Sequence, residues 1–232
     1  MKTTKKALKT KKRRRWRSPL IIASILLILL VFAARIYGLD KPSRDAELLT
    51  LVNPWNTIPD NYEPQLCTLS DGQQIDRRCY DDLMLMLDDC RAAGNSPYIC
   101  SAYRTWDKQQ ALFDNKIQRL ESAGLDAETA RAEAAKVVAV PGTSEHQLGL
   151  ALDIIDAGYT SLDEGQENTS TQQWLMANSW NYGFILRYPN GTTDITGIIY
   201  EPWHYRYVGR TAAEQIHELD ITFEEYISMF YR

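Results

Sequence analysis

The chain has 232 residues, with 26 Lys and Arg against 30 Asp and Glu, and 44% of its residues are hydrophobic. The formal charge of −4 hides an asymmetry, because ten of the 26 cations lie within the first 17 residues. The remainder carries 16 basic and 30 acidic residues. This acidic balance excludes the binding of polyanions by charge alone, so we predict no nucleic-acid partner.

The N-terminus has the composition of a membrane anchor. Residues 1–17 are basic, and residues 18–34, "SPLIIASILLILLVFAA", carry no charge. As a helix this run would span about 26 Å, close to the ~30 Å hydrocarbon core of a bilayer. A cleaved signal peptide is the alternative, because "VFAA" resembles a cleavage site, but the run exceeds the usual apolar region of such peptides. We therefore predict a cytoplasmic tail (1–17) and an uncleaved transmembrane helix (18–34), with everything after it exported.

The exported part is predicted to be one domain behind a short linker. Residues 35–47 are polar and irregular and are expected to form a tether. Residues 48–232 are long enough for a single domain with its own core, and they contain no internal repeat.

All four cysteines lie in the exported part, within 34 residues of one another. An even, clustered set outside the membrane is typical of two disulfides. A metal site is the alternative, but none of the spacings is C-x-x-C. Three pairings are possible, and Cys67–Cys79 with Cys90–Cys100 is preferred because each closes a short loop.

The first predicted helix and strand follow the first cysteines. Residues 80–94 place apolar side chains at helical spacing on one face and end at a glycine, which predicts a helix; those side chains are Leu83, Met86, Leu87 and Cys90. Residues 96–103, "SPYICSAY", follow a Gly-Asn-Ser-Pro turn and are aromatic and aliphatic. They are expected to form a strand.

The rest of the chain mixes both element types. Helices are expected at 107–123, 127–138 and 171–183, and strands at 148–155, 184–187, 197–200 and 203–207. Thr222 and Glu225 form a capping box before a last helix. Helices interspersed with short, antiparallel strands predict an α+β domain with a small sheet flanked by helices.

Two of the three histidines stand near acidic residues in suggestive patterns. His146 precedes Asp153 by seven residues, with Gly149 between them, and Glu201 precedes His204 by three. Two imidazoles and one carboxylate suit catalytic zinc, and a nearby unbound carboxylate suits a general base. Each pair alone is also common in ordinary loop and core contacts. Asp153, however, lies in the apolar run "LGLALDII", where a buried carboxylate needs a partner such as a cation.

Longer segments around these residues resemble a known family. "GTSEHQLGLALDI" contains the pattern S-x-H-x-x-G-x-A-x-D, and "EPWHYRYVG" matches a second signature. "SAYRTWDKQQALF" and "YGFILRYP" are similar to further family segments. Together they resemble the VanY-type D-alanyl-D-alanine carboxypeptidases, zinc peptidases of the Hedgehog/D,D-peptidase fold. Departures are small: Ala102 stands where glycine is usual, and Thr105 where serine is common.

The resemblance implies a role for each matching residue. It implies one zinc ion per chain held by three ligands, Glu201 as the catalytic base, and Arg104 as the residue that stabilises the tetrahedral intermediate. The ligands so implied are His146, Asp153 and His204. Ser144 and Gln109 match positions that contact the peptide, and Trp203 is expected to form part of the cleft wall. His217 is expected to be an ordinary surface histidine.

The implied reaction removes the C-terminal D-alanine from peptidoglycan stem peptides. An L,D-carboxypeptidase or a stem-peptide endopeptidase of the same fold is the nearest alternative, and a wall-binding module without turnover is a second one. The presence of Glu201 argues against a pure binder. We expect a monomer on the extracytoplasmic side of a bacterial cell membrane.

Overall fold

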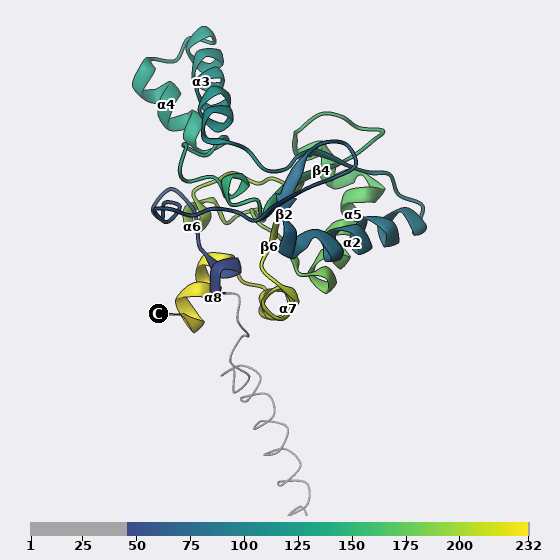
Figure 1. Ribbon diagram of the computed structural model, residues 1–232. Helices are drawn as coiled ribbons and strands as arrows, with labels where there is room; N and C mark the ends of the chain where they lie inside the picture. The colour runs from purple at the N-terminus through teal and green to yellow at the C-terminus, as the bar shows by residue number, and fades with distance from the viewer. Residues whose placement is uncertain (1–45, 232) are drawn as a thin grey trace, which may run out of the picture. The chain divides into compact units, whose positions relative to one another are not determined.

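The computed structural model describes residues 46–231 (Figure 1). The predicted cytoplasmic tail, the anchor and nearly all of the tether lie outside these residues. Among the residues that are described, none belongs to a helix with the length and hydropathy needed to cross a bilayer.

A four-stranded antiparallel sheet in the order β3-β4-β6-β5 forms the centre of the domain. Its strands are β3 (Pro97–Ser101), β4 (Ala151–Asp156), β5 (Phe184–Leu186) and β6 (His204–Tyr207). Strand β4 lies between β3 and β6, and its first five residues are all buried. A separate hairpin pairs β1 (Leu66–Thr68) with β2 (Gln74–Asp76). The prediction of a mixed domain with small antiparallel sheets and helices is confirmed.

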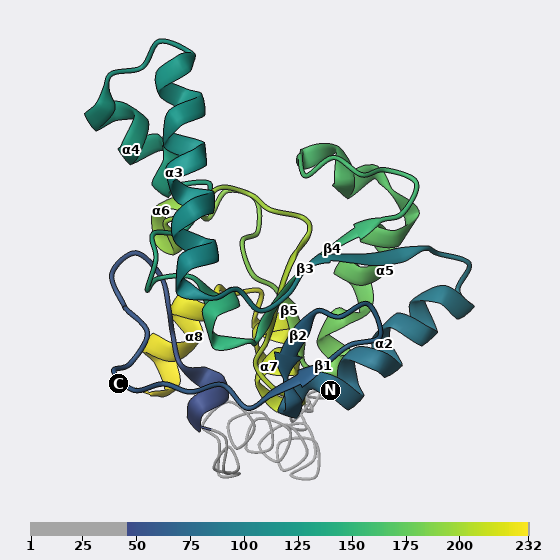
Figure 2. The ribbon, with the colours of Figure 1, turned by 45° about the horizontal axis from the view of Figure 1, so that its top comes forward.

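Seven α-helices surround these sheets within residues 46–231. They are α2 (Tyr80–Ala92), α3 (Trp106–Ser122), α4 (Ala127–Ala135), α5 (Ser170–Asn178), α6 (Thr193–Thr196), α7 (Arg210–Leu219) and α8 (Phe223–Phe230). Five short 3-10 helices join them: η1 (Ala46–Leu49), η2 (Arg77–Cys79), η3 (Glu145–Leu148), η4 (Glu164–Asn168) and η5 (Ser179–Tyr182). Helices α2 and α5 lie side by side, whereas α3 and α4 pair with each other and stand away from the rest (Figures 1 and 2).

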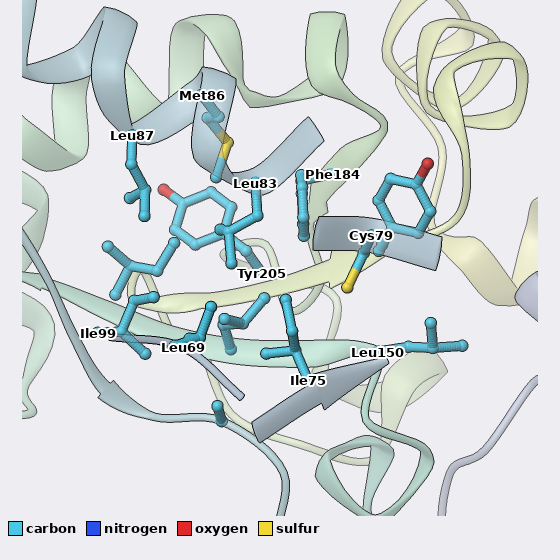
Figure 3. Close-up of a cluster of buried hydrophobic side chains, with 14 of the residues drawn as sticks. Leu69, Ile75, Cys79, Leu83, Met86, Leu87, Ile99, Leu150, Phe184 and Tyr205 are labelled. Carbon is cyan, nitrogen blue, oxygen red and sulfur yellow. The ribbon is translucent and has the colours of Figure 1, made fainter. Parts of the chain in front are cut away.

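The main core lies between α2 and the sheet. The helix contributes its predicted face, and Figure 3 shows Leu83, Met86 and Leu87 above Tyr205 of β6 and Ile99 of β3. Each large apolar side chain that is fully buried in this way stabilises the fold by about 1.5–3 kcal/mol. This packing holds the sheet that carries the candidate site.

Two predicted elements need correction. The strand predicted at 148–155 begins only at Ala151, because the chain before it closes the 3-10 turn η3. The strand predicted at 197–200 is wrong. Gly197 ends α6 in the left-handed region at φ +78°. The Ile199 amide then donates to the carbonyl of Lys136, so this segment links to the end of the α3–α4 hairpin and not to the sheet.

The predicted disulfides Cys67–Cys79 and Cys90–Cys100 are also wrong, since all four cysteines are free thiols. Two of the thiols donate hydrogen bonds to backbone carbonyl groups. Cys79 Sγ donates to the carbonyl of Asp76 at 3.0 Å, and Cys100 Sγ donates to the carbonyl of Asp153 at 3.4 Å. Burial raises the pKa of Cys90 to about 11 and that of Cys100 to about 12. The cysteines therefore pack as small apolar side chains.

Gly183 and Gly191 have similar φ angles, but replacing each with alanine should lower the unfolding free energy by different amounts. A Cβ on Gly183 (φ +83°) would meet Tyr207 Cε2 at 2.7 Å and the Arg210 amide nitrogen at 3.0 Å, whereas one on Gly191 (φ +79°) would meet nothing within 4 Å. Gly191→Ala should cost about 1–2 kcal/mol of unfolding free energy from the backbone alone. Gly183→Ala should cost a further ~1–3 kcal/mol from overpacking. Equal losses in urea unfolding would contradict this packing.

Candidate active site

Two central strands and one turn bring the predicted ligands together. Asp153 on β4 and His204 on β6 are directly paired in the sheet register. His146 lies in η3, which ends at Gly149 in the left-handed region at φ +74°. A Cβ on Gly149 would lie 3.0 Å from Leu66 Cδ2 and 3.1 Å from the Asp76 amide nitrogen, so glycine is needed there. The turn then feeds directly into β4 and leaves His146 beside Asp153.

The three side chains converge on one buried point. One ligand atom from each of His146, Asp153 and His204 lies within 4.8 Å of the others, and all three residues are buried. His146 Nε2 is 3.3 Å from Asp153 Oδ2, and His204 Nδ1 is 3.1 Å from Asp153 Oδ1. A single ion between these atoms could bind all three, so the set fits a zinc site.

The outer nitrogen of each imidazole supports this fit. His146 Nδ1 lies 2.7 Å from the carbonyl of Ala102, which can only accept a hydrogen bond. The proton therefore belongs on Nδ1, and the Nε2 lone pair faces Asp153. His204 Nε2 lies 3.5 Å from Glu145 Oε2, and neither buried atom has a hydrogen-bond partner among the described residues. An Nε2–H directed at Glu145 would likewise leave Nδ1 free as a ligand.

Glu145 belongs to a buried charge cluster that the sequence analysis missed. Its Oε1 accepts from Arg187 Nε at 2.7 Å and lies 2.9 Å from Arg206 Nη1. Arg187 also donates two hydrogen bonds to Glu224. Burial opposes the charge on Glu145, but both guanidinium groups outweigh that cost and lower its pKa. The sequence does carry a signal for this cluster, because an arginine lies inside each of two apolar runs: Arg187 in "FILRY" and Arg206 in "HYRYV".

Arg104 reaches the same point from the segment between β3 and α3. Its Nη2 donates to Asp153 Oδ2 at 2.5 Å, and its Nε donates to Ser101 Oγ at 2.8 Å. Gln109 is fully buried, accepts from Arg104 Nη1 at 3.4 Å and donates to the carbonyl of Ala139 at 2.7 Å. The structure therefore places Gln109 against Arg104, and its contact with a peptide stays a prediction.

Glu201 stands next to the three predicted ligands without being one of these convergent side chains. Its Oε2 is 3.7 Å from His204 Nδ1, and the residue is only 7% exposed. Burial is the largest influence on this carboxyl and raises its pKa to about 8. A carboxyl with such a pKa can both accept and return a proton near neutral pH.

The histidines differ in their surroundings. Burial and the positive charge of Arg104 lower the pKa of His146 to about 4. Burial also opposes charge on His204, but the neighbouring carboxylates of Asp153 and Glu145 prevail and raise its pKa to about 9. Burial penalises the Asp153 carboxylate too, yet His146 and Arg104 hold its pKa well below the ordinary range. The site is thus built around a carboxylate that needs positive charge.

A cleft of about 330 Å³ opens onto these groups. Ser144 and Trp203 line it, as do the three predicted ligands, Glu201 and Arg104. Seven of the eight residues singled out from the sequence therefore face one space, and the eighth, Gln109, lies behind Arg104. The third histidine, His217, stacks on Trp180 at 4.4 Å between ring centroids on α7, outside this cleft.

The family described as VanY, D-alanyl-D-alanine carboxypeptidase, matches residues 72–210. The chain belongs to the VanY family. It is 47% identical over 180 residues to a D-alanyl-D-alanine carboxypeptidase of Enterococcus faecalis, covering 78% of this chain and 65% of that protein. It is also 37% identical over 203 residues to the putative carboxypeptidase YodJ of Bacillus subtilis, covering 83% of this chain and 71% of that one.

Solved VanY structures share the fold. VanYB in complex with D-alanine-D-alanine superimposes with a TM-score of 0.73 at 46% identity, covering 78% of this chain and 98% of that one. A D,D-pentapeptidase VanY variant in complex with Zn(II) gives a TM-score of 0.71 at 45% identity, with 77% and 98% covered. The LdcB LD-carboxypeptidase gives 0.68 at 37% identity, with 78% and 86% covered.

Proposed function

We propose that the protein is a zinc-dependent D,D-carboxypeptidase that removes the C-terminal D-alanine from peptidoglycan stem peptides. The observation that carries this proposal is the convergence of His146, Asp153 and His204 within 4.8 Å, with Glu201 alongside. Membership of the VanY family and the D-alanine-D-alanine and Zn(II) complexes of its relatives support the same reaction.

His146, Asp153 and His204 hold the zinc ion in this proposal. When bound, zinc supplies Lewis-acid chemistry, polarising a carbonyl and lowering the pKa of water. The chain would provide one carboxylate and two imidazoles, of which His204 gives up a proton when it binds the ion, and this ligand set leaves a coordination position open. The Ala102 carbonyl orients His146, and Glu145 faces the outer nitrogen of His204.

Glu201 acts as general base and then as general acid. Its carboxylate takes a proton from the attacking water and returns it to the nitrogen of the departing D-alanine. The side chain is buried at the cleft next to His204, where it meets little bulk water. This position suits a carboxyl that must change its protonation state during each turnover.

Arg104 supplies the fixed positive charge of the cleft. Its guanidinium neutralises the oxyanion of the tetrahedral intermediate or the terminal carboxylate of the peptide. Ser101 and Gln109 hold it from behind, so its orientation is set before substrate arrives. Ser144 and Trp203 line the space that the peptide enters.

The same proposal places the domain outside the cytoplasm. Residues 18–34 anchor it in a bacterial cell membrane, residues 1–17 stay in the cytoplasm, and residues 35–47 tether the catalytic domain 48–232 near its insoluble substrate. The uncharged run after ten cations supports this arrangement. That the protein acts as a monomer stays a prediction.

L,D-carboxypeptidase activity is the second candidate function, because the LdcB LD-carboxypeptidase is 37% identical with a TM-score of 0.68. Incubation of the purified full chain with synthetic stem pentapeptide and tetrapeptide, followed by mass spectrometry, separates the two. We expect the pentapeptide to lose one alanine and the tetrapeptide to stay intact. Cleavage of the tetrapeptide alone, or within either peptide, would overturn the D,D-carboxypeptidase assignment.

The variant Glu201→Gln tests whether Glu201 acts as the general base or as a zinc ligand. Because three ligands remain, this variant should keep its zinc while kcat falls by about 10²–10⁴-fold. His204→Ala, three residues away, should lose both zinc and activity. The measurements are zinc content per chain and kcat for each purified variant.

His217→Ala is the matched control, since this histidine stacks on Trp180 outside the cleft and should change neither quantity. Loss of zinc from Glu201→Gln would make the glutamate a ligand. Near-normal turnover in that variant would assign the base to another residue.

A further inference from the structure

The cleft extends well beyond the proposed zinc site along one face of α3. Leu112, Asn115, Lys116 and Arg119 line this part of the cleft. Their spacing of three, one and three residues places them on one side of the helix. Helix α3 begins beside Arg104 and runs away from the sheet (Figure 2). These side chains therefore form a wall that leads outward from the catalytic groups.

Charge is distributed unevenly along this cleft. The carboxylates that line it, Glu145, Asp153 and Glu201, all belong to the catalytic end. The α3 wall carries two cations, and neither Lys116 nor Arg119 forms an ion pair within the described part of the chain, where Arg78, Arg104, Arg187 and Arg210 all do. The outer part of the cleft thus offers positive charge that no acid within ion-pair distance neutralises.

The cleft is also lined by large apolar and aromatic side chains, which are Leu162, Tyr188, Ile198 and Trp203. Leu162 is 51% exposed, although it is a large apolar side chain. The acid next to it, Asp163, is already used, because its Oδ1 accepts from Tyr159 Oη at 2.7 Å and from the Gly165 amide at 2.9 Å. A peptide in the cleft would therefore meet both these apolar side chains and the two cations.

We propose that Lys116 and Arg119 form a subsite for a free carboxylate of the substrate, located two to four residues on the N-terminal side of the scissile bond. This inference rests on the proposed carboxypeptidase function. Gln109 touches Arg104 and marks the catalytic end of α3. Lys116 and Arg119 lie seven and ten residues further along, about 10 and 15 Å at 1.5 Å per residue.

An extended peptide advances about 3.3 Å per residue, so these distances correspond to roughly three to four and a half residues. Helical side chains lean toward the N-terminus of their helix, which brings both head groups back toward the catalytic end. The subsite therefore selects peptides by a charge in their upstream part, separately from the groups that recognise the C-terminal residues.

The test uses synthetic peptides that end in D-alanyl-D-alanine and carry glutamate or glutamine at one position. That position is two, three or four residues before the scissile bond in successive peptide pairs. For one of these pairs the wild-type full chain should show a KM about two- to fivefold lower for the glutamate peptide, with kcat within about twofold. The preference should weaken at high salt, because the cations are partly exposed.

The double variant Lys116→Gln/Arg119→Gln should lose this preference and keep its kcat and its zinc. Lys108→Gln is the matched control, because Lys108 is an exposed cation on the same helix that does not line the cleft. It should keep the preference. A preference that persists in the double variant, or that Lys108→Gln removes equally, overturns the subsite.

The two proposals fail in different ways. If the wild type cleaves every glutamate and glutamine peptide with the same KM, only the subsite is overturned. If it cleaves none of them, the proposed function is overturned and the subsite with it.

Discussion

The structure depends on a carboxylate in the middle of its buried central strand. Asp153 lies in β4 with apolar neighbours on both sides, where an uncompensated negative charge would cost several kcal/mol or more. Groups from three other parts of the chain meet it: Arg104 from the segment before α3 donates a hydrogen bond to it, and His204 from β6 and His146 from η3 lie against its two oxygens, where a shared cation would join all three. Those contacts join the two strands, the turn and the base of the α3–α4 hairpin, so the packing of the sheet and the geometry of the site are one arrangement.

A second buried carboxylate extends this arrangement away from the cleft. Glu145 lies between Arg187 and Arg206, and Arg187 continues to Glu224 on α8. His204 therefore has Asp153 on one nitrogen and Glu145 on the other. Removing one member of such a buried cluster leaves an unpaired charge, which is costly. Because Arg187 and Arg206 are fully buried, the cluster should hold His204 in one orientation more firmly than apolar packing alone.

Features could be predicted from the sequence where the residues that form them follow a regular spacing or a short motif within one segment. The α2 face and the capping box of α8 are confirmed, and the grouping of His146, Asp153 and His204 agrees with the family pattern. The Glu145 cluster escaped prediction because its members are up to 79 residues apart and no local pattern indicates which distant charges meet. The cysteines were misjudged because clustering is typical of disulfides, whereas the fold directs Cys79 and Cys100 toward backbone carbonyls.

Because the four cysteines are free thiols, the most direct test of the proposed metal centre is to identify the atoms that bind zinc. Zinc binds cysteine readily, so the imidazole–carboxylate site must be distinguished from a thiolate site. X-ray absorption at the zinc edge on the purified, zinc-loaded full chain reports the ligand atoms directly. The account predicts two imidazoles with oxygen ligands at about 2.0–2.2 Å and no sulfur. A sulfur shell at about 2.3 Å, or a spectrum without imidazole, would contradict it.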